Sequence, residues 1–352
     1  MVTKQAYSFI KQLPKVDLHL HLDGSVKPKT LLELARAQGV TLPTQSIADL
    51  SSYMSVGDNC TSLAEYLRPF DLVAKVLQTK QALERVAYEL VEQAKQDNCA
   101  YIEVRFAPQQ HREQGLQLEE VLNAVMKGLT KGSCMFGVET RVITCCMRHH
   151  DAEVNKEVIR VAAKYLNKGL VAVDLAGDEN SFPTSLFRDT FALANQLEIP
   201  ITIHAGEAAG AESIKEAVKQ LGAARIGHGV RLTEDDKLLH EIKKREIPLE
   251  MCPISNLQTK ATDGWGHYPI RYYFDQGLKV TVHTDNMTVS DTCITKEFSI
   301  LMDHFHFTIT ELNQLTINAI DASFLSFQEK KTLKQKCLKQ MKKQEQSFPM
   351  VV

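Results

Sequence analysis

The sequence lacks a strong excess of either charge. Its 352 residues include 41 Lys and Arg against 43 Asp and Glu, which leaves a formal net charge of −2. A protein that binds nucleic acid through its phosphates uses a positive excess to displace counterions, so we expect no nucleic-acid partner. Hydrophobic residues make up 44% of the chain, and this share together with the low net charge excludes disorder over most of its length.

Long hydrophobic runs are also missing. No segment approaches the roughly 20 apolar residues that span a bilayer, so we expect no membrane partner. Residues 1–15 contain neither the apolar core nor the small-residue cleavage pattern of a signal peptide. The eight cysteines form no C-x-x-C pair and no regular framework, which is typical of reduced thiols. We therefore expect a cytoplasmic protein.

No low-complexity segment, repeat or linker rich in Pro, Gly or Ser divides the chain, so we expect one domain over residues 1–352. A short apolar run with strand character, followed by a helical pattern, does recur. Eight such runs occur, at 16–22, 100–106, 137–145, 170–176, 200–204, 224–230, 248–253 and 279–284. Alternating strands and helices imply parallel strands, and eight units predict an α/β fold of the closed (β/α)8 (TIM) barrel type. An open doubly wound sheet is the alternative, which the count of eight disfavours.

The first crossover is much longer than the later ones. Residues 24–98 contain two or three helical patterns where one helix is enough to reach the second strand. We expect the extra helices, inserted after the first strand, to form a lid beside the top of the barrel. Residues 287–352 are predicted to be helical, and we interpret their lysine-rich tail as a solvated helix face.

Potential metal ligands and acid–base groups fall where the apolar runs end. In a strand, residues two apart share a face, so the two imidazoles of the first run point the same way. The carboxyl ends of barrel strands meet at one rim, where barrel enzymes carry their active sites, so these side chains are expected to share one pocket. The residues concerned are His19, His21, Asp23, His204, Glu207, His228, Asp285 and Asn286.

Three imidazoles and one carboxylate among these residues predict a zinc site with a position left for water. The ion would lower the pKa of that water toward neutrality. Glu207 is placed to exchange protons with a substrate, and His228 to orient or to deprotonate the water. The pattern therefore predicts metal-assisted hydrolysis with one zinc ion per chain. The ligands would be His19, His21, His204 and Asp285.

Several other polar residues in the apolar runs are expected to be structural. Asp17 shares the face of the strand histidines but lies lower in the barrel, where a hydrogen-bonded carboxylate is typical. Arg105 is expected to pair with a buried acid, and His283 to have a structural role. Cys252 has no activating base nearby in the sequence, so a catalytic thiol is not expected.

Six motifs resemble, in order and over most of the chain, the signatures of the adenosine deaminase family. They are KVDLHLHLDGS, VDLAGDE, ITIHAGEA, RIGHGV, EMCPISNLQT and VTVHTDN. The resemblance implies a zinc-dependent (β/α)8 hydrolase that converts adenosine or 2'-deoxyadenosine to the inosine form and releases ammonia. A small purine nucleoside would then be its partner.

The resemblance also implies roles for individual residues. Glu207 would give a proton to purine N1, and His228 would assist the attacking hydroxide. Asp23 would bind the ribose end, the backbone N–H of Gly177 would reach N3, and Asn286 would face N7. The implied substrate-binding residues are His21, Asp23, Gly177 and Asn286.

Two positions bear on the substrate. The commonest family pattern has two adjacent aspartates where this chain has Asp285 and Asn286, which alters how N7 is recognised. An adenine deaminase of the same family is the alternative function, and those enzymes typically carry Glu where Asp23 stands. A barrel retained only as a binding protein is a second alternative, which the intact set of metal and acid–base residues disfavours.

Overall fold

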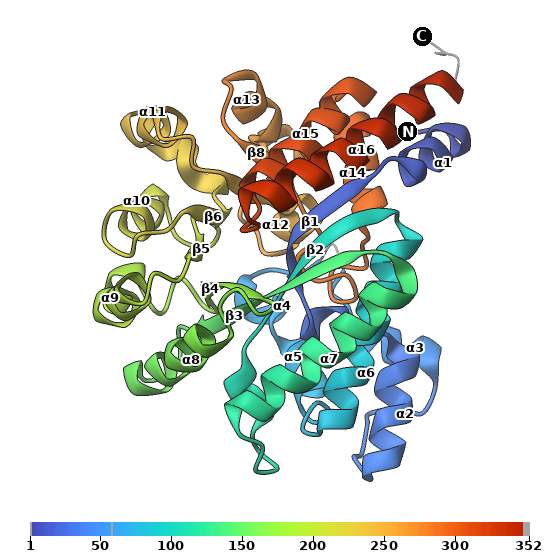
Figure 1. Ribbon diagram of the computed structural model, residues 1–352, viewed down its shortest axis with the longest axis vertical. Coiled ribbons are helices and arrows are strands. Elements are labelled where there is room, and N and C mark those ends of the chain that lie inside the picture. Colours follow the sequence, from blue (N-terminus) through green and yellow to red (C-terminus); the bar gives the residue numbers. More distant parts are fainter. Residues whose placement is uncertain (1, 58, 348–352) are drawn as a thin grey trace.

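Eight parallel strands form the centre of the molecule, and helices surround them (Figure 1). The structure is a computed structural model that describes residues 2–57 and 59–347. Each of the eight predicted runs forms a strand, because its apolar residues are buried between the barrel interior and the helices. The strands are β1 (Lys15–His21), β2 (Cys99–Phe106), β3 (Glu139–Met147), β4 (Leu170–Ala176), β5 (Thr202–Ala205), β6 (Arg225–His228), β7 (Leu249–Met251) and β8 (Val280–Val282).

The strands pair in chain order. β1 to β4 form one parallel sheet and β5 to β8 a second, each with four strands. A parallel bridge between Val173 and Ile201 joins β4 to the start of β5, and a second between Leu20 and Asp285 joins β1 to the end of β8. The backbone N–H of His21 also donates to the carbonyl of Asp285 at 2.7 Å. These contacts link both pairs of sheet edges, and the predicted barrel is confirmed.

The helices that follow the strands are amphipathic, with apolar residues at helical spacing. In α10 (Ala211–Lys219), Ile214, Ala217 and Val218 are buried while Glu212 is exposed. Burial of such stripes on the strands fixes the outer layer of the barrel. The other helices of this layer are α6 (Lys80–Gln96), α7 (Leu118–Phe136), α8 (Ala152–Tyr165), α9 (Arg188–Gln196), α11 (Asp236–Lys244), α13 (Ile270–Asp275) and α15 (Ile309–Ala322).

The long first crossover contains the predicted extra helices. Ser46 and Ser62 begin two of them, since each side chain accepts a hydrogen bond from a backbone N–H of the first turn. Leu63 and Tyr66 pack with Val289, which follows β8, so this part of the insertion lies at the carboxyl ends of the strands. The inserted helices before α6 are α2 (Pro28–Gln38), α3 (Ile47–Met54), α4 (Leu63–Tyr66) and α5 (Arg68–Ala74).

The lysine-rich tail forms α16 (Phe327–Ser347), which lies close to α1 (Lys4–Gln12) (Figure 1). Leu333 and Cys337 of α16 pack against Val16 at the start of β1, while the outward-facing lysines are exposed. Residues 348–352 of the predicted helical segment lie outside the described residues. The remaining helices are α12 (Pro253–Gln258) and α14 (Ile294–Phe305), with short 3-10 helices at Asp23–Ser25, Pro108–His111, Thr184–Phe187, Val230–Glu234 and Trp265–His267.

All eight cysteines are free, and six of them are buried. Among residues 2–57 and 59–347, no helix combines the length and the apolar character that a membrane crossing requires.

Candidate active site

The predicted site residues meet at the carboxyl ends of the strands. Eight of the nine line a single cavity. The ninth, His19, does not line the cavity; it is fully buried and contacts His204, which does. The strands β1, β5 and β6 carry the histidines to this point, and the turns after β1, β4, β5 and β8 carry the other groups. The eight lining residues are His21, Asp23, Gly177, His204, Glu207, His228, Asp285 and Asn286.

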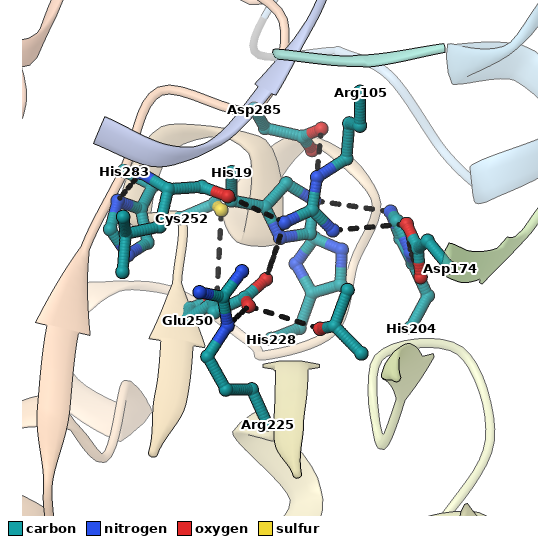
Figure 2. Close-up of polar contacts among 12 residues, drawn as sticks. His19, Arg105, Asp174, His204, Arg225, His228, Glu250, Cys252, His283 and Asp285 are labelled. Atoms are coloured by element: carbon teal, nitrogen blue, oxygen red, sulfur yellow. Dashed lines mark hydrogen bonds and ion pairs between the residues drawn. The ribbon is translucent and has the colours of Figure 1, made fainter. Parts of the chain in front are cut away.

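Four ligand atoms converge at the base of the cavity. Figure 2 shows three of the residues that carry them, His19, His204 and Asp285. The Nε2 atom of His204 lies 3.1 Å from Nε2 of His19 and 3.2 Å from Nε2 of His21. Asp285 Oδ1 lies 3.6 Å from His19 Nε2 and 3.4 Å from His21 Nε2. A tetrahedral site with metal–nitrogen bonds of about 2.0–2.1 Å places its ligand atoms about 3.3 Å apart. The spacing therefore fits one metal ion.

Two buried carboxylates that contact the Nδ1 atoms of these histidines also indicate a metal site. His19 Nδ1 lies 2.9 Å from Glu250 Oε2, and His204 Nδ1 lies 3.0 Å from Asp174 Oδ2. A carboxylate accepts, so each Nδ1 carries the ring proton and each Nε2 directs a lone pair at the other. Burial lowers the pKa of His204, but the charge of Asp174, its hydrogen bond and the charge of Asp285 together leave that pKa raised, so positive charge is favoured at this point. A bound cation relieves the repulsion between the lone pairs.

Arg105 links the two carboxylates (Figure 2). Its guanidinium donates to Asp174 at 3.0 Å and to Glu250 at 2.7 Å, and Glu250 also accepts from Arg225 at 2.5 Å. Burial alone would raise the pKa of Glu250, but the two arginines outweigh it and hold that pKa well below its usual range. The expected pairing of Arg105 with a buried acid is confirmed. Asp174 and Glu250 were not predicted as site residues, although each is an acid inside an apolar run.

Glu207 faces the cavity from the turn after β5. Its Oε1 accepts a hydrogen bond from Thr259 Oγ1 at 2.9 Å, and its Oε2 lies 3.6 Å from His228 Nε2. Burial, with the nearby charge of Asp285, raises the pKa of Glu207 to about 8. The raised pKa favours the protonated form of the side chain, which can give its proton to a bound molecule.

A second glutamate shapes this turn. Glu179, in the loop after β4, accepts hydrogen bonds at 2.7–3.1 Å from the four successive backbone N–H groups of residues 206–209. Gly206 has φ of +71°, and a Cβ there would lie 2.4 Å from Ile214 Cδ1, so the turn requires glycine. Together these features fix Glu207 over the cavity. Sequence reasoning missed Glu179, although it lies within the VDLAGDE motif.

His228 and Asp285 reach the site through left-handed backbone, with φ of +65° and +60°. Non-glycine residues adopt this conformation at a cost of order 1 kcal/mol, and such strained residues are enriched at functional sites. Asn256 Nδ2 lies 2.9 Å from His228 Nδ1, and Ser255 Oγ donates to Asp285 Oδ2 at 2.6 Å. Two neighbouring residues of α12 thus hold these two side chains.

The expected substrate-binding residues line the same cavity. Burial raises the pKa of Asp23 to about 6, and Gly177 has φ of +103° beside the chain at Arg148. Asn286 Nδ2 donates to Tyr66 Oη at 3.0 Å and to Asp285 Oδ1 at 2.7 Å. Both amide hydrogens of Asn286 are therefore engaged, and a hydrogen bond from this amide to a substrate has to replace one of these contacts.

Comparison with known sequences decides the family. The family model described as adenosine deaminase matches residues 14–340. The chain belongs to the adenosine deaminase family. A relative named adenosine deaminase, from Enterococcus faecalis, is 45% identical over 329 residues, which cover 94% of this chain and 97% of the relative. The sequence-based assignment to this family of metal-dependent hydrolytic deaminases is confirmed.

Solved structures share the fold of this deaminase family member. The crystal structure of an adenine deaminase from Arthrobacter aurescens is 28% identical with a TM-score of 0.86, covering 94% of this chain and 99% of the other. A Zn-bound amidohydrolase from Burkholderia ambifaria is 22% identical with a TM-score of 0.89, covering 99% and 95%. The second likeness bears on the fold alone.

The inserted helices contribute to the deaminase cavity. Leu63, Tyr66 and Leu67 line it from α4 and its end, and Phe70 and Asp71 line it from α5. Tyr66 Oη lies 2.6 Å from Ser290 Oγ, so its hydroxyl ties α4 to the segment after β8. The insertion was predicted to lie near the site, but none of these residues was predicted to line it. The amphipathic stretch SLAEYLRPF was the available signal.

The residues that were expected to be structural in this deaminase make hydrogen bonds within the protein or are buried. His283 Nδ1 accepts from the backbone N–H of Leu18 at 2.9 Å, and Asp17 Oδ2 accepts from Thr284 Oγ1 at 2.6 Å. Cys252 lies near His228 and Asp285, but burial raises the pKa of its thiol well above the usual value. The thiol therefore stays protonated, and it is a poor metal ligand and nucleophile.

Proposed function

We propose that this protein catalyses the hydrolytic deamination of adenosine and 2'-deoxyadenosine to inosine and 2'-deoxyinosine, with release of ammonia, as a step of purine salvage. The observation that carries the proposal is the placement of the buried Glu207 side chain in one cavity with the converging ligand atoms of three histidines and Asp285. Identity of 45% to a relative named adenosine deaminase supports the substrate.

The proposal includes one Zn²⁺ per chain, held by His19, His21, His204 and Asp285. Three imidazole nitrogens and one carboxylate oxygen form the donor set that zinc favours. Burial lowers the pKa of His19 and His21 well below the usual value, so both rings are neutral and ready to bind metal. When bound, the ion would act as a Lewis acid that lowers the pKa of a water molecule.

The protein's own groups then move the protons. Glu207 gives its proton to N1 as the water oxygen bonds to C6. The proton on N1 makes C6 a better electrophile. One proton of the water returns Glu207 to its acid form. The C6–N bond breaks, and the amino group leaves as ammonia with the second water proton. The product keeps a hydrogen on N1 and an oxygen on C6, so atoms and charge balance.

Recognition of the nucleoside is assigned to the far side of the cavity. Asp23 would accept hydrogen bonds from ribose hydroxyls, and the backbone N–H of Gly177 would donate to N3. His21, which lines the cavity beside His204, would contact the nucleoside as well as the metal. Asn286 faces N7 once its amide exchanges a contact. We further propose that residues 24–98 close over the bound nucleoside as a lid, and that the single domain acts in the cytoplasm, where its eight free cysteines stay reduced.

Adenine deamination is the second candidate, which the likeness to an adenine deaminase structure at 28% identity favours. The two substrates differ by the ribose, which Asp23 is proposed to bind. Free adenine would leave that buried carboxyl with its hydrogen bond from the backbone N–H of Gly24 and none from a ribose, at a cost of about 1–3 kcal/mol.

A comparison of adenosine and adenine as substrates tests the proposed function. Purified protein is incubated with adenosine or adenine, and the absorbance change on deamination is followed. We expect kcat/KM for adenosine to exceed that for adenine by about 5- to 150-fold, which is the cost of the missing ribose hydrogen bonds converted at about 1.4 kcal/mol per tenfold. Equal or higher activity on adenine would assign the protein to the second candidate, and no activity on either base or nucleoside would refute both.

A further inference from the structure

Asn256 contacts the Nδ1 atom of His228. It lies on α12, the helix that follows β7, and its Nδ2 atom is 2.9 Å from His228 Nδ1. Asn256 is fully buried and His228 is 1% exposed, so the protein rather than bulk water determines the partner of Nδ1. His228 Nε2, on the opposite side of the ring, lies 3.6 Å from Glu207 Oε2.

The orientation of the Asn256 amide follows from its other contacts. Its Oδ1 atom lies 3.2 Å from the backbone nitrogen of Cys252 and 2.9 Å from the Oη atom of Tyr268, a residue of the loop after α12. A backbone N–H can only donate, so the amide atom that it meets must be the oxygen. The reversed amide would place two donors against each other in a buried site, at a cost of about 1–3 kcal/mol. The NH2 group therefore faces His228.

An NH2 group can only donate, so His228 Nδ1 must accept, and the neutral ring carries its hydrogen on Nε2. We propose that Asn256 is a positioning residue that keeps His228 in this tautomer, so that Nε2 donates a hydrogen bond to the oxygen attacking C6. An Nε2 that already carries hydrogen has no lone pair to accept the water proton. Of the two roles that the sequence left open for His228, orientation of the water is thereby selected over deprotonation.

The inference rests on the proposed function for the identity of the attacking oxygen, but the tautomer can be measured without any reaction. A fixed donor aimed at developing negative charge contributes about 10²–10³-fold in rate in well-studied enzymes. The arrangement assigns that contribution to His228, and assigns to Asn256 the task of presenting the correct ring nitrogen.

The first test is the tautomer of the wild-type protein. Metal-loaded protein labelled with ¹⁵N-histidine is studied by long-range ¹H–¹⁵N correlation, in which Nε2 couples to both ring carbons' hydrogens and Nδ1 to one. A His228→Asn variant identifies the ring by the loss of its signals. We expect Nε2 to be protonated and Nδ1 to be unprotonated. A hydrogen on Nδ1 in the wild-type protein would overturn the proposal, whether or not the protein deaminates adenosine.

Variants then test the role of Asn256. Asn256→Asp replaces the donor by an acceptor of the same shape, and we expect a hydrogen to appear on Nδ1. Tyr268→Phe is the matched control, because Cys252 still holds the amide, and its ring should keep the wild-type tautomer. Asn256→Ala should lower kcat by about 10-fold or more while KM changes less than about twofold, since only the donor to the attacking oxygen is disturbed. An unchanged tautomer in Asn256→Asp, or an Asn256→Ala effect confined to KM, would overturn the proposal.

Discussion

Replacing Glu207 by Gln separates its proton chemistry from its packing. Glu207 is 5% exposed, and its Oε1 accepts from Thr259 at 2.9 Å. Glutamine has the same shape and keeps an oxygen for Thr259, but its amide is a very poor proton donor. We expect E207Q to fold and bind metal while kcat falls by at least about 10²-fold, the usual contribution of a positioned acid. Near-wild-type turnover would remove Glu207 from the mechanism.

The same substitution has a predicted effect on stability. Burial and then Asp285 raise the pKa of Glu207 from 4.5 to about 8 in the folded protein. Between these values the unfolded chain releases the proton while the folded protein keeps it, so the free energy of unfolding falls as pH rises. Each pKa unit corresponds to about 1.4 kcal/mol, so wild type loses on the order of 3–4 kcal/mol across this window. Glutamine does not titrate, and E207Q escapes the loss.

The assay compares free energies of unfolding in urea at pH 5 and pH 8. Chelator-treated protein is used, because a bound cation would itself change the pKa of Glu207. The stability of E207Q relative to wild type should rise by about 3 kcal/mol between the two pH values. Glu297 is a matched control, since burial also raises its pKa to about 8, and E297Q should show the same trend. A difference between E207Q and wild type that is the same at both pH values would refute the reasoning.

Three further predictions concern the metal site, the proposed lid and the recognition of the purine base. Asp174→Asn removes the carboxylate behind His204, so metal affinity should fall about 10–100-fold in a competition with a chelating dye, and unchanged affinity would contradict the assigned role. Tyr66→Phe breaks the contacts to Asn286 and Ser290, so backbone hydrogen exchange over residues 63–74 should become faster, whereas wild-type protection would show that the hydroxyl does not hold the lid. The value of kcat/KM for 7-deazaadenosine should be lower than that for adenosine by a factor that corresponds to about 1–3 kcal/mol. An undiminished value would exclude a contact from Asn286 to N7.

Sequence reasoning located the strands and the convergence of the site because both depend on short-range pattern. The alternation of apolar runs and helical stretches is local, and the barrel rule then brings distant strand ends together. His19 and His21 needed only the two-residue period of a strand, and Glu207 needed only its place after β5. These residues lie where the pattern put them.

The residues that contact the predicted ligands and His228 could not be predicted from short-range pattern. Asp174, Glu250 and Asn256 act through contacts to residues 28 to 231 positions away in the chain. A buried acid in a strand indicates a partner, but the sequence does not say which. Tyr66 was missed for a related reason, since its contacts depend on how the inserted helices fold back over β8. In each case packing between distant segments determines the role.

The measurement that tests the central claim most directly is a zinc titration of the metal-free enzyme with adenosine as substrate. Chelator-treated protein receives Zn²⁺ in steps, and adenosine consumption and bound zinc are determined in the same samples. Activity should rise in proportion to bound zinc and reach its plateau at one ion per chain, because the proposed ligands His19, His21, His204 and Asp285 would hold a single ion. Activity that is independent of zinc, or that requires two ions per chain, would contradict the account.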